Sequence, residues 1–197
     1  VHTNCADIKV CFVTDEIVRV RASFDKELAE ESYVLATTAW EDRLDSLFEG
    51  ERTRVTPVAP EVAEDDAKIV LKSAALSLVL EKDPICIKLI DSEGTELYCS
   101  IAGSPFIKDS NNRVVSYTRM EEEDCFYGFG EKSGNLNKNK EFLRERATDA
   151  MGYDATKMDT LYKHIPFYIR LSRSTKKAVG VFYHNFYESV FNMGREK

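Results

Sequence analysis

Hydrophobic and polar positions alternate with a period of two along much of the chain. The pattern begins over residues 8–12 and resumes, after the polar pair Thr14-Asp15, over residues 17–24. Successive side chains of a β-strand point to opposite faces, so this alternation is typical of strands with one buried face. The two segments therefore predict a pair of strands joined by a tight turn.

The same alternation recurs four times between residues 67 and 102. The expected strands cover residues 69–71, 76–80, 85–89 and 97–101. Residues 82–84 (Lys-Asp-Pro) and 91–94 (Asp-Ser-Glu-Gly) lie between strands and are of the types that favour turns. Consecutive strands joined by short turns predict a meander.

Three segments near the C-terminal end also have the length and composition of strands. They cover residues 165–171, 178–183 and 187–191. Many short strands without intervening helical segments favour two packed antiparallel sheets. We therefore predict an all-β fold, an antiparallel β-sandwich with one or two short helices, in which residues 1–197 form a single domain.

One segment departs from the strand pattern. Residues 38–41 (Thr-Ala-Trp-Glu) have the spacing of a helix capping box, and apolar side chains recur at helical spacing at Trp40, Leu44, Leu47 and Phe48. We predict a short amphipathic helix over 38–49 that lies across an open sheet face, with a partner-binding helix as the alternative.

Two stretches are expected to be loops. Residues 57–66 contain two prolines and an acidic run, which predicts an exposed loop. Residues 131–163 form the longest region without strand alternation, and loops of this length in compact domains are usually functional or disordered. The region contains the amide-rich run 135–139 and the acids Asp149, Asp154 and Asp159, so we treat it as a candidate binding region.

Composition and charge restrict the class of protein. The 197 residues are 43% hydrophobic and 31% charged, which is typical of a folded globular protein. The formal net charge of −7 repels phosphate backbones and anionic lipids. No apolar run approaches the ~18 residues of a spanning helix. We expect neither nucleic acid nor a membrane as a partner.

The five cysteines are odd in number, widely spaced and mostly set among apolar residues. This favours buried reduced thiols over a disulfide framework. The chain begins at Val1 without Met and without a basic and apolar leader, so we expect no signal peptide in this sequence and a fragment of a longer protein. Together these features favour a reducing, cytoplasmic location.

Familiar catalytic and cofactor-binding patterns do not occur in the sequence. The glycine-rich run 128–134 has Ser133 where a dinucleotide fingerprint requires glycine, and no βαβ unit follows. We expect these glycines to permit a bulge or a close backbone approach where a strand leaves the sheet, with Glu131 pairing locally. The three histidines share no metal-ligand spacing, and no GxSxG elbow occurs. We expect no metal and no cofactor.

Five ordered blocks resemble glycoside hydrolase family 31, which includes α-glucosidases and α-xylosidases. They are residues 15–21 (DEIVRVR), 126–131 (FYGFGE), 146–150 (RATDA), 161–169 (LYKHIPFYI) and 180–185 (GVFYHN). The resemblance extends over nearly the whole chain and is strongest between the second and the last block. Several blocks in the family's order are far more specific than any one of them.

The resemblance implies a galactose-mutarotase-like β-sandwich (a supersandwich) that precedes a catalytic (α/β)8 barrel in the same polypeptide. In that family the barrel carries both catalytic carboxylates of a retaining mechanism, so we expect no catalytic residue in these 197 residues. We expect the chain to be a fragment that ends before the barrel. The partners implied are that barrel and, in the full-length enzyme, an α-linked glucoside or related oligosaccharide.

The resemblance also implies one substrate-binding residue. In the family a loop of the sandwich extends over the barrel mouth, and its aspartate contacts sugar hydroxyls; Asp149 matches that aspartate. A carboxylate accepts charge-assisted hydrogen bonds from two vicinal hydroxyls and so orients a sugar. Many relatives have Asn where this chain has Ala147. Alternatively, Asp149 closes an Asx-turn after Thr148.

Three functional hypotheses remain open. The first is the N-terminal domain of an α-glucosidase-like hydrolase, which supports the barrel and completes its substrate pocket. The second is a stand-alone carbohydrate-binding module, which needs an exposed aromatic platform; Tyr153, Tyr162 and Trp40 are the candidates. The third is a structural or interaction domain without a ligand.

Overall fold

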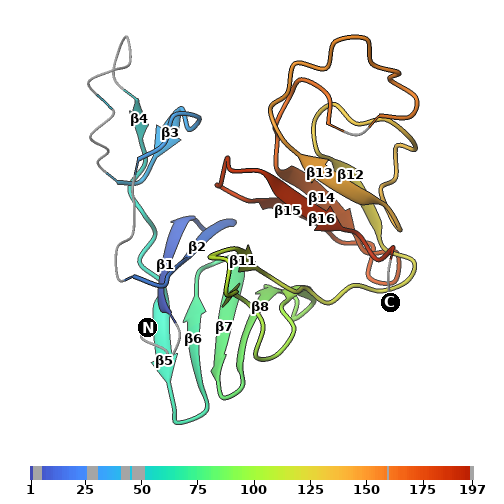
Figure 1. Cartoon of the computed structure of the whole chain (residues 1–197). Coiled ribbons are helices and arrows are strands. Elements are labelled where there is room, and N and C mark those ends of the chain that lie inside the picture. The colour runs from blue at the N-terminus through green and yellow to red at the C-terminus, as the bar shows by residue number, and fades with distance from the viewer. Residues whose placement is uncertain (2–5, 26–30, 41–44, 46–51, 159, 196–197) are drawn as a thin grey trace. The chain divides into compact units, whose positions relative to one another are not determined.

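The computed structural model describes residues 1, 6–25, 31–40, 45, 52–158 and 160–195, and its chain divides into two compact units, 1–119 and 120–197 (Figure 1). Nearly all of the regular structure is β, and the sheets are antiparallel except for one short parallel pair. This confirms the predicted all-β fold class. A single domain over 1–197 stays a prediction, and each unit is described by itself.

The first unit opens with the predicted strand pair. β1 (Asp7–Thr14) and β2 (Ile17–Ser23) are antiparallel, with Val10 opposite Val20 and a bulge near the turn. The hydroxyl of Ser73 donates to the carbonyl oxygen of Asp15 at 2.8 Å. This contact attaches the turn to the second sheet of the unit.

That second sheet is the predicted meander with one strand more than expected. Its strands pair in sequence order: β5 (Glu61–Glu64), β6 (Lys68–Lys72), β7 (Leu76–Lys82), β8 (Ile85–Asp91) and β9 (Glu96–Cys99). The prediction of a loop within 57–66 is wrong for β5. All four of its side chains are exposed, so only backbone pairing with β6 makes it a strand, and no burial pattern marked it.

The two sheets of the first unit pack through a shared apolar core. β1 contributes Ile8 and Phe12, while the meander contributes buried side chains of β6, β7 and β8, among them Leu78 and Leu80. Phe12, Leu78 and Leu80 are almost completely buried. The alternation in the sequence therefore marked the inward positions of both layers.

Short strand pairs complete the first unit. β3 (Thr37–Thr38) runs parallel to β4 (Thr53–Arg54), and β10 (Ile107–Lys108) forms a hairpin with β11 (Val114–Val115). The helix predicted over 38–49 begins at a residue of β3, and residues 41–44 and 46–49 lie outside the described part of the chain.

The second unit consists of two further antiparallel sheets. One has the order β12 (Cys125–Gly128), β14 (Phe167–Leu171), β15 (Ala178–Phe182), and the other pairs β13 (Phe142–Glu145) with β16 (Ser189–Asn192). Their core holds Phe126, Phe129, Leu143, Tyr168 and Met193. The three strands predicted near the C-terminal end are confirmed as β14, β15 and β16.

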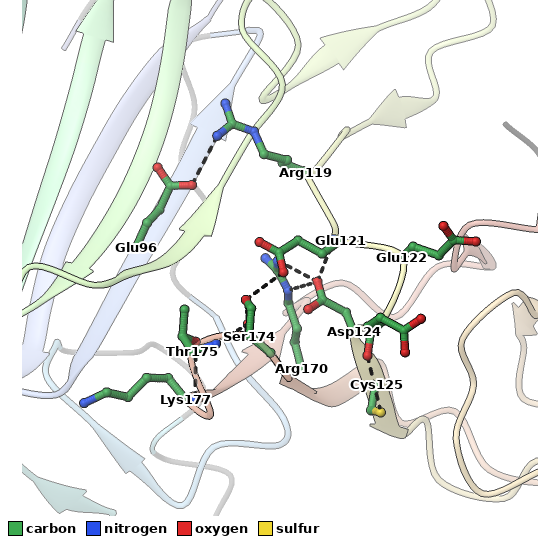
Figure 2. Close-up of polar contacts among 12 residues, drawn as sticks. Glu96, Arg119, Glu121, Glu122, Asp124, Cys125, Arg170, Ser174, Thr175 and Lys177 are labelled. Carbon is green, nitrogen blue, oxygen red and sulfur yellow. Dashed lines mark hydrogen bonds and ion pairs between the residues drawn. The ribbon is translucent and has the colours of Figure 1, made fainter.

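A buried ion pair joins β14 to the start of β12. Arg170 donates from Nε and Nη2 to Oδ2 of Asp124, at 2.8 and 2.6 Å, and the same oxygen accepts the backbone N–H of Glu121 at 2.9 Å (Figure 2). The Asp124 side chain is completely buried. Ser174 donates to the Glu121 carboxylate at 2.7 Å, which extends the network to the β14–β15 turn.

Candidate functional site

The candidate site is the region between β12 and β14, and it starts with a sharp bend after β12. Gly128, Phe129 and Gly130 all have positive φ, at 133°, 64° and 64°. A Cβ at Gly128 would lie 2.5 Å from the carbonyl oxygen of Phe167. The predicted close backbone approach is therefore confirmed at Gly128, where no other residue fits. Phe129 is fully buried and stacks on Tyr168 with ring centroids 5.1 Å apart.

Beyond the bend, a buried ion pair closes the base of the region. Nζ of Lys132 lies 3.0 Å from Oε1 of Glu145, and the two side chains are 1% and 0% exposed. The other oxygen of Glu145 accepts the backbone N–H of Ile165 at 2.9 Å, and Lys132 also donates to the carbonyl of Arg144. One carboxylate thus binds both the beginning of the region and its end.

An exposed ion pair repeats this link at the surface. Nζ of Lys163 lies 3.3 Å from Oε1 of Glu131, and both side chains are largely open to solvent. The expectation that Glu131 pairs locally is confirmed. Such exposed pairs contribute little stability compared with buried ones.

The amide-rich run 135–139 has a structural role. Oδ1 of Asn137 accepts the backbone N–H of Phe126 at 2.9 Å, and Nδ2 of Asn139 donates to the carbonyls of Glu122 and Asp124. These side-chain amides form the hydrogen bonds that a neighbouring strand would otherwise make to the backbone at and just before β12. The backbone N–H and C=O groups there therefore have partners. The run therefore holds the base of the region to the sheet.

The expectation that 131–163 lacks strands is wrong at β13. This strand pairs with β16, with Leu143 opposite Phe191 and Glu145 opposite Ser189. Leu143 and Glu145 are its two inward residues, and the second of these is charged. A polar residue at an inward position removes the apolar alternation, so this strand has no signal in the sequence.

Asp149 lies at the surface of the remaining segment, 146–164. Within the described residues its carboxylate makes no hydrogen bond and no ion pair, so the turn expected from the Asx-turn alternative is not formed there. The neighbouring Ala150 is buried. The structure thus presents Asp149 as an exposed carboxylate that can accept hydrogen bonds.

The other acids of the segment differ from Asp149. Asp154 accepts the N–H and the hydroxyl of Thr156 at 2.9 and 2.6 Å, and these bonds, together with Lys157, lower the pKa of its carboxyl. Asp154 therefore stabilises its own turn. Asp159 lies outside the described part of the chain.

The aromatic candidates separate into two groups. Tyr153 and Tyr162 form an edge-to-face pair with centroids 5.7 Å apart in the same segment as Asp149, and both are exposed. Trp40 is half-buried, and the guanidinium of Arg19 lies 3.8 Å from its ring centroid. Arg19 therefore covers one face of Trp40, whereas the tyrosine pair remains open to a ligand.

Cysteine and metal chemistry are limited in the described residues. The four cysteines there are free thiols, and Sγ of Cys86 lies 3.9 Å from Sγ of Cys99. Burial, reinforced by Cys86, raises the pKa of the Cys99 thiol to about 11. A hydrogen bond from Arg173, at 3.2 Å, lowers the pKa of Cys125. No group of three or more His, Cys, Asp or Glu in this part of the chain could hold a metal ion.

Comparison with known proteins gives a family match over nearly the whole chain. The sequence profile of the glycosyl hydrolase 31 N-terminal galactose mutarotase-like domain matches residues 7–192. A curated relative, alpha-glucosidase 2 of Bacillus thermoamyloliquefaciens, is 27% identical over 192 residues, which is 97% of this chain and 22% of the relative.

Solved structures share the fold. A GH31 dextranase of Flavobacterium johnsoniae, in complex with isomaltotriose, superposes with a TM-score of 0.73 at 24% identity, over 98% of this chain and 21% of the dextranase. The GH31 alpha-xylosidase of Xanthomonas citri gives a TM-score of 0.58 at 16% identity, over 86% and 17%. The chain thus spans about a fifth of the length of these relatives. Among the described residues no helix is long and apolar enough to cross a bilayer.

Proposed function

This chain belongs to the family of glycosyl hydrolase 31 N-terminal galactose mutarotase-like domains, and from this we propose that it is the N-terminal domain of an α-glucosidase-like retaining glycoside hydrolase. Its role is to support the catalytic (α/β)8 barrel of the same polypeptide and to supply a loop to the substrate pocket. The observation that carries the proposal is the family match over 7–192, nearly the whole chain.

In this function the chain helps to bind and orient the sugar substrate, and the barrel cleaves the glycosidic bond. A retaining glycosidase needs an acid and a nucleophile whose carboxyl groups lie ~5 Å apart across the glycosidic bond. We propose that both belong to the barrel and that these 197 residues contain no catalytic residue. The proposed substrate is an α-linked glucoside or oligosaccharide. The curated relative is called an alpha-glucosidase, and the dextranase was solved with isomaltotriose and with glucose.

Asp149 is the residue proposed to contact the substrate. Its carboxylate is exposed, and within the described residues no other group of the chain occupies it. The segment that carries it is fixed at its base by the buried pair of Lys132 and Glu145. A carboxylate accepts charge-assisted hydrogen bonds from sugar hydroxyls and so orients the sugar.

The test compares the 197-residue chain with the complete polypeptide encoded by its gene. The complete polypeptide is expected to release p-nitrophenol from an aryl α-glucoside, and the 197-residue chain is expected to release none, because the groups that protonate the leaving oxygen and attack the anomeric carbon are absent from it. Turnover by the isolated chain, or a complete polypeptide without a barrel and without activity, would refute the proposal.

The alternative is a stand-alone carbohydrate-binding module, and the exposed Tyr153–Tyr162 pair is the observation that favours it. Aromatic side chains in such a pair offer flat apolar surface for a sugar ring. Isothermal titration of the isolated chain with isomaltotriose distinguishes the two functions. Binding that is lost in Tyr162→Ala supports the module, whereas no binding to the isolated chain supports the N-terminal domain.

We also propose a reducing, cytoplasmic location. The free thiols of Cys86 and Cys99, which contact each other at 3.9 Å as a thiol pair, support it.

A further inference from the structure

None of the outward strand positions of the three-stranded sheet β12–β14–β15 is charged, and the one charged side chain described on this face, Arg173 of the β14–β15 turn, lies at its edge on Cys125. The inward face of the sheet carries Phe126, Tyr168 and Val181, which pack into the core of the second unit. Because neighbours across the strands share a face, the register assigns the outward positions. They are Cys125, Tyr127, Phe167, Ile169, Leu171, Ala178, Gly180 and Phe182.

A glycine shapes the centre of this outward face. A Cβ at Gly180 would lie 3.2 Å from two ring carbons of Phe167, so the ring lies directly over the glycine. Phe167, Ile169 and Phe182 are 39%, 41% and 41% exposed. Phe182 continues the surface beyond the strand, because its ring lies 6.3 Å from that of Phe186, which is also exposed.

This pattern differs from that of a sheet with one face in water. Such a sheet alternates apolar inward positions with polar outward ones, whereas strands covered on both faces read as nearly continuous apolar runs. β14 reads FYIRL, in which the one charged residue, Arg170, faces inward and pairs with Asp124, and β15 reads AVGVF. A contiguous apolar patch on the surface of a folded unit marks an interaction site.

We propose that this face, formed by Phe167, Ile169, Phe182 and Phe186 and here called the β14–β15 face, is the docking surface for the catalytic barrel of the complete polypeptide. The inference rests on the proposed function. Its occupant follows from length: the chain covers 21–22% of the relatives' polypeptides, so most of such a protein lies outside these residues and is tethered to them. A tethered partner is present at high effective concentration, so an apolar surface of ordinary size suffices to hold it.

The location of the face also suits the proposed role of the loop. β14 carries two of these positions, Phe167 and Ile169, and the N–H of Ile165, just before β14, is bound to Glu145 at the base of the Asp149 segment. A barrel docked on β14 is therefore connected to that segment through a strand and a buried carboxylate. Sites supported by rigid elements are held more precisely than sites on free loops.

Hydroxyl-radical footprinting tests the inference without a substitution. Oxidation of the three phenylalanines of the face is measured by mass spectrometry in the isolated chain and in the complete polypeptide, with the radical dose calibrated on an added peptide. We expect oxidation to fall at least about fivefold in the complete polypeptide, because docking removes these rings from solvent.

A double variant tests the energetic contribution. Ile169→Ser/Phe182→Ser is expected to leave the melting temperature of the isolated chain nearly unchanged, because both side chains are already half exposed. In the complete polypeptide it is expected to raise hydrogen exchange of β14 and β15 toward the rate in the isolated chain. Val62→Ser, at an exposed position of edge strand β5, is the matched control and is expected to change neither.

The outcomes separate this inference from the function on which it rests. A complete polypeptide that hydrolyses α-glucosides while the face remains equally reactive overturns the docking surface and leaves the function standing. An isolated chain that dimerises with these residues protected also overturns it, because the occupant is then a second copy. A protecting domain without glycosidase activity overturns the proposed function and leaves the docking surface standing.

Discussion

Removal of one partner from the buried Lys132–Glu145 pair is expected to destabilise the second unit strongly. Lys132→Met leaves the carboxylate of Glu145, which is completely buried, with only the N–H of Ile165 as a donor among the contacts described above. Breaking a buried ion pair on one side costs about 3–5 kcal/mol, because the remaining charge is desolvated without compensation. For a chain of this size each kcal/mol corresponds to a change of roughly 2–4 °C in melting temperature.

The expected loss for Lys132→Met is therefore about 6–20 °C. The measurement is thermal and urea unfolding of the 197-residue chain, with hydrogen exchange of peptides from β13 and β14 to assign the effect to the second unit. Lys163→Met removes the exposed pair with Glu131 at the same base and is the matched control. It is expected to cost less than about 1 kcal/mol.

A double variant gives the sharper test of the reasoning. Lys132→Met/Glu145→Leu removes both charges and leaves the N–H of Ile165 without its acceptor, which costs about 1–3 kcal/mol. The double variant should therefore be more stable than Lys132→Met alone. If the stability losses of Lys132→Met and Glu145→Leu simply add, or if Lys132→Met is as stable as the Lys163→Met control, the buried ion pair does not hold the two ends of the region together.

Three further outcomes follow from the described geometry. Asp149→Ala in the complete polypeptide is expected to lower kcat/KM for an aryl α-glucoside by about one to two decades, the equivalent of one charge-assisted hydrogen bond, while the melting temperature stays the same. An unchanged kcat/KM with a lower melting temperature would show that Asp149 is not a sugar ligand. Gly128→Ala should destabilise the chain to urea clearly more than Gly134→Ala, because both have positive φ but a Cβ meets a backbone oxygen only at Gly128. Cys99 should react with iodoacetamide far more slowly than Cys11 at pH 8, because a pKa of about 11 leaves about one thiolate in a thousand. The rate at Cys99 should rise with pH. Equal rates at Cys99 and Cys11 would contradict the burial of Cys99.

Strands could be predicted from the sequence where the burial of side chains follows the two-residue period of a β-strand. Ile8 and Phe12, and likewise Leu78 and Leu80, alternate because each second side chain enters a core, so their strands could be predicted. β5 could not be predicted, because its exposed side chains leave only backbone pairing as a signal. The fold class could therefore be predicted from the two-residue period and the turn residues, whereas the exposed edge strand β5 could not.

The candidate site could be predicted less completely than the fold, because its contacts join residues far apart in the sequence. The partners of Glu145 are Lys132 and the backbone of Ile165, and nothing local in the sequence specifies a pairing between residues so far apart. Asp149 was singled out by resemblance, since one exposed acid among 34 acidic residues has no distinguishing pattern. A charged residue inside an otherwise strand-like segment is the signal that could have indicated Glu145.

The hydrogen bond between Glu145 and Ile165 brings together the two ends of residues 146–164. The two ends of this segment are held together by this contact, so the exposed part of the segment between the buried Ala150 and Leu161 can change in length with little effect on the sheets. Doubling the length of a flexible loop costs only about 0.6 kcal/mol of closure entropy. Evolution can therefore vary the exposed part of the segment, and protein engineers can graft that part from a relative, to alter sugar preference while both sheets of the unit keep their cores.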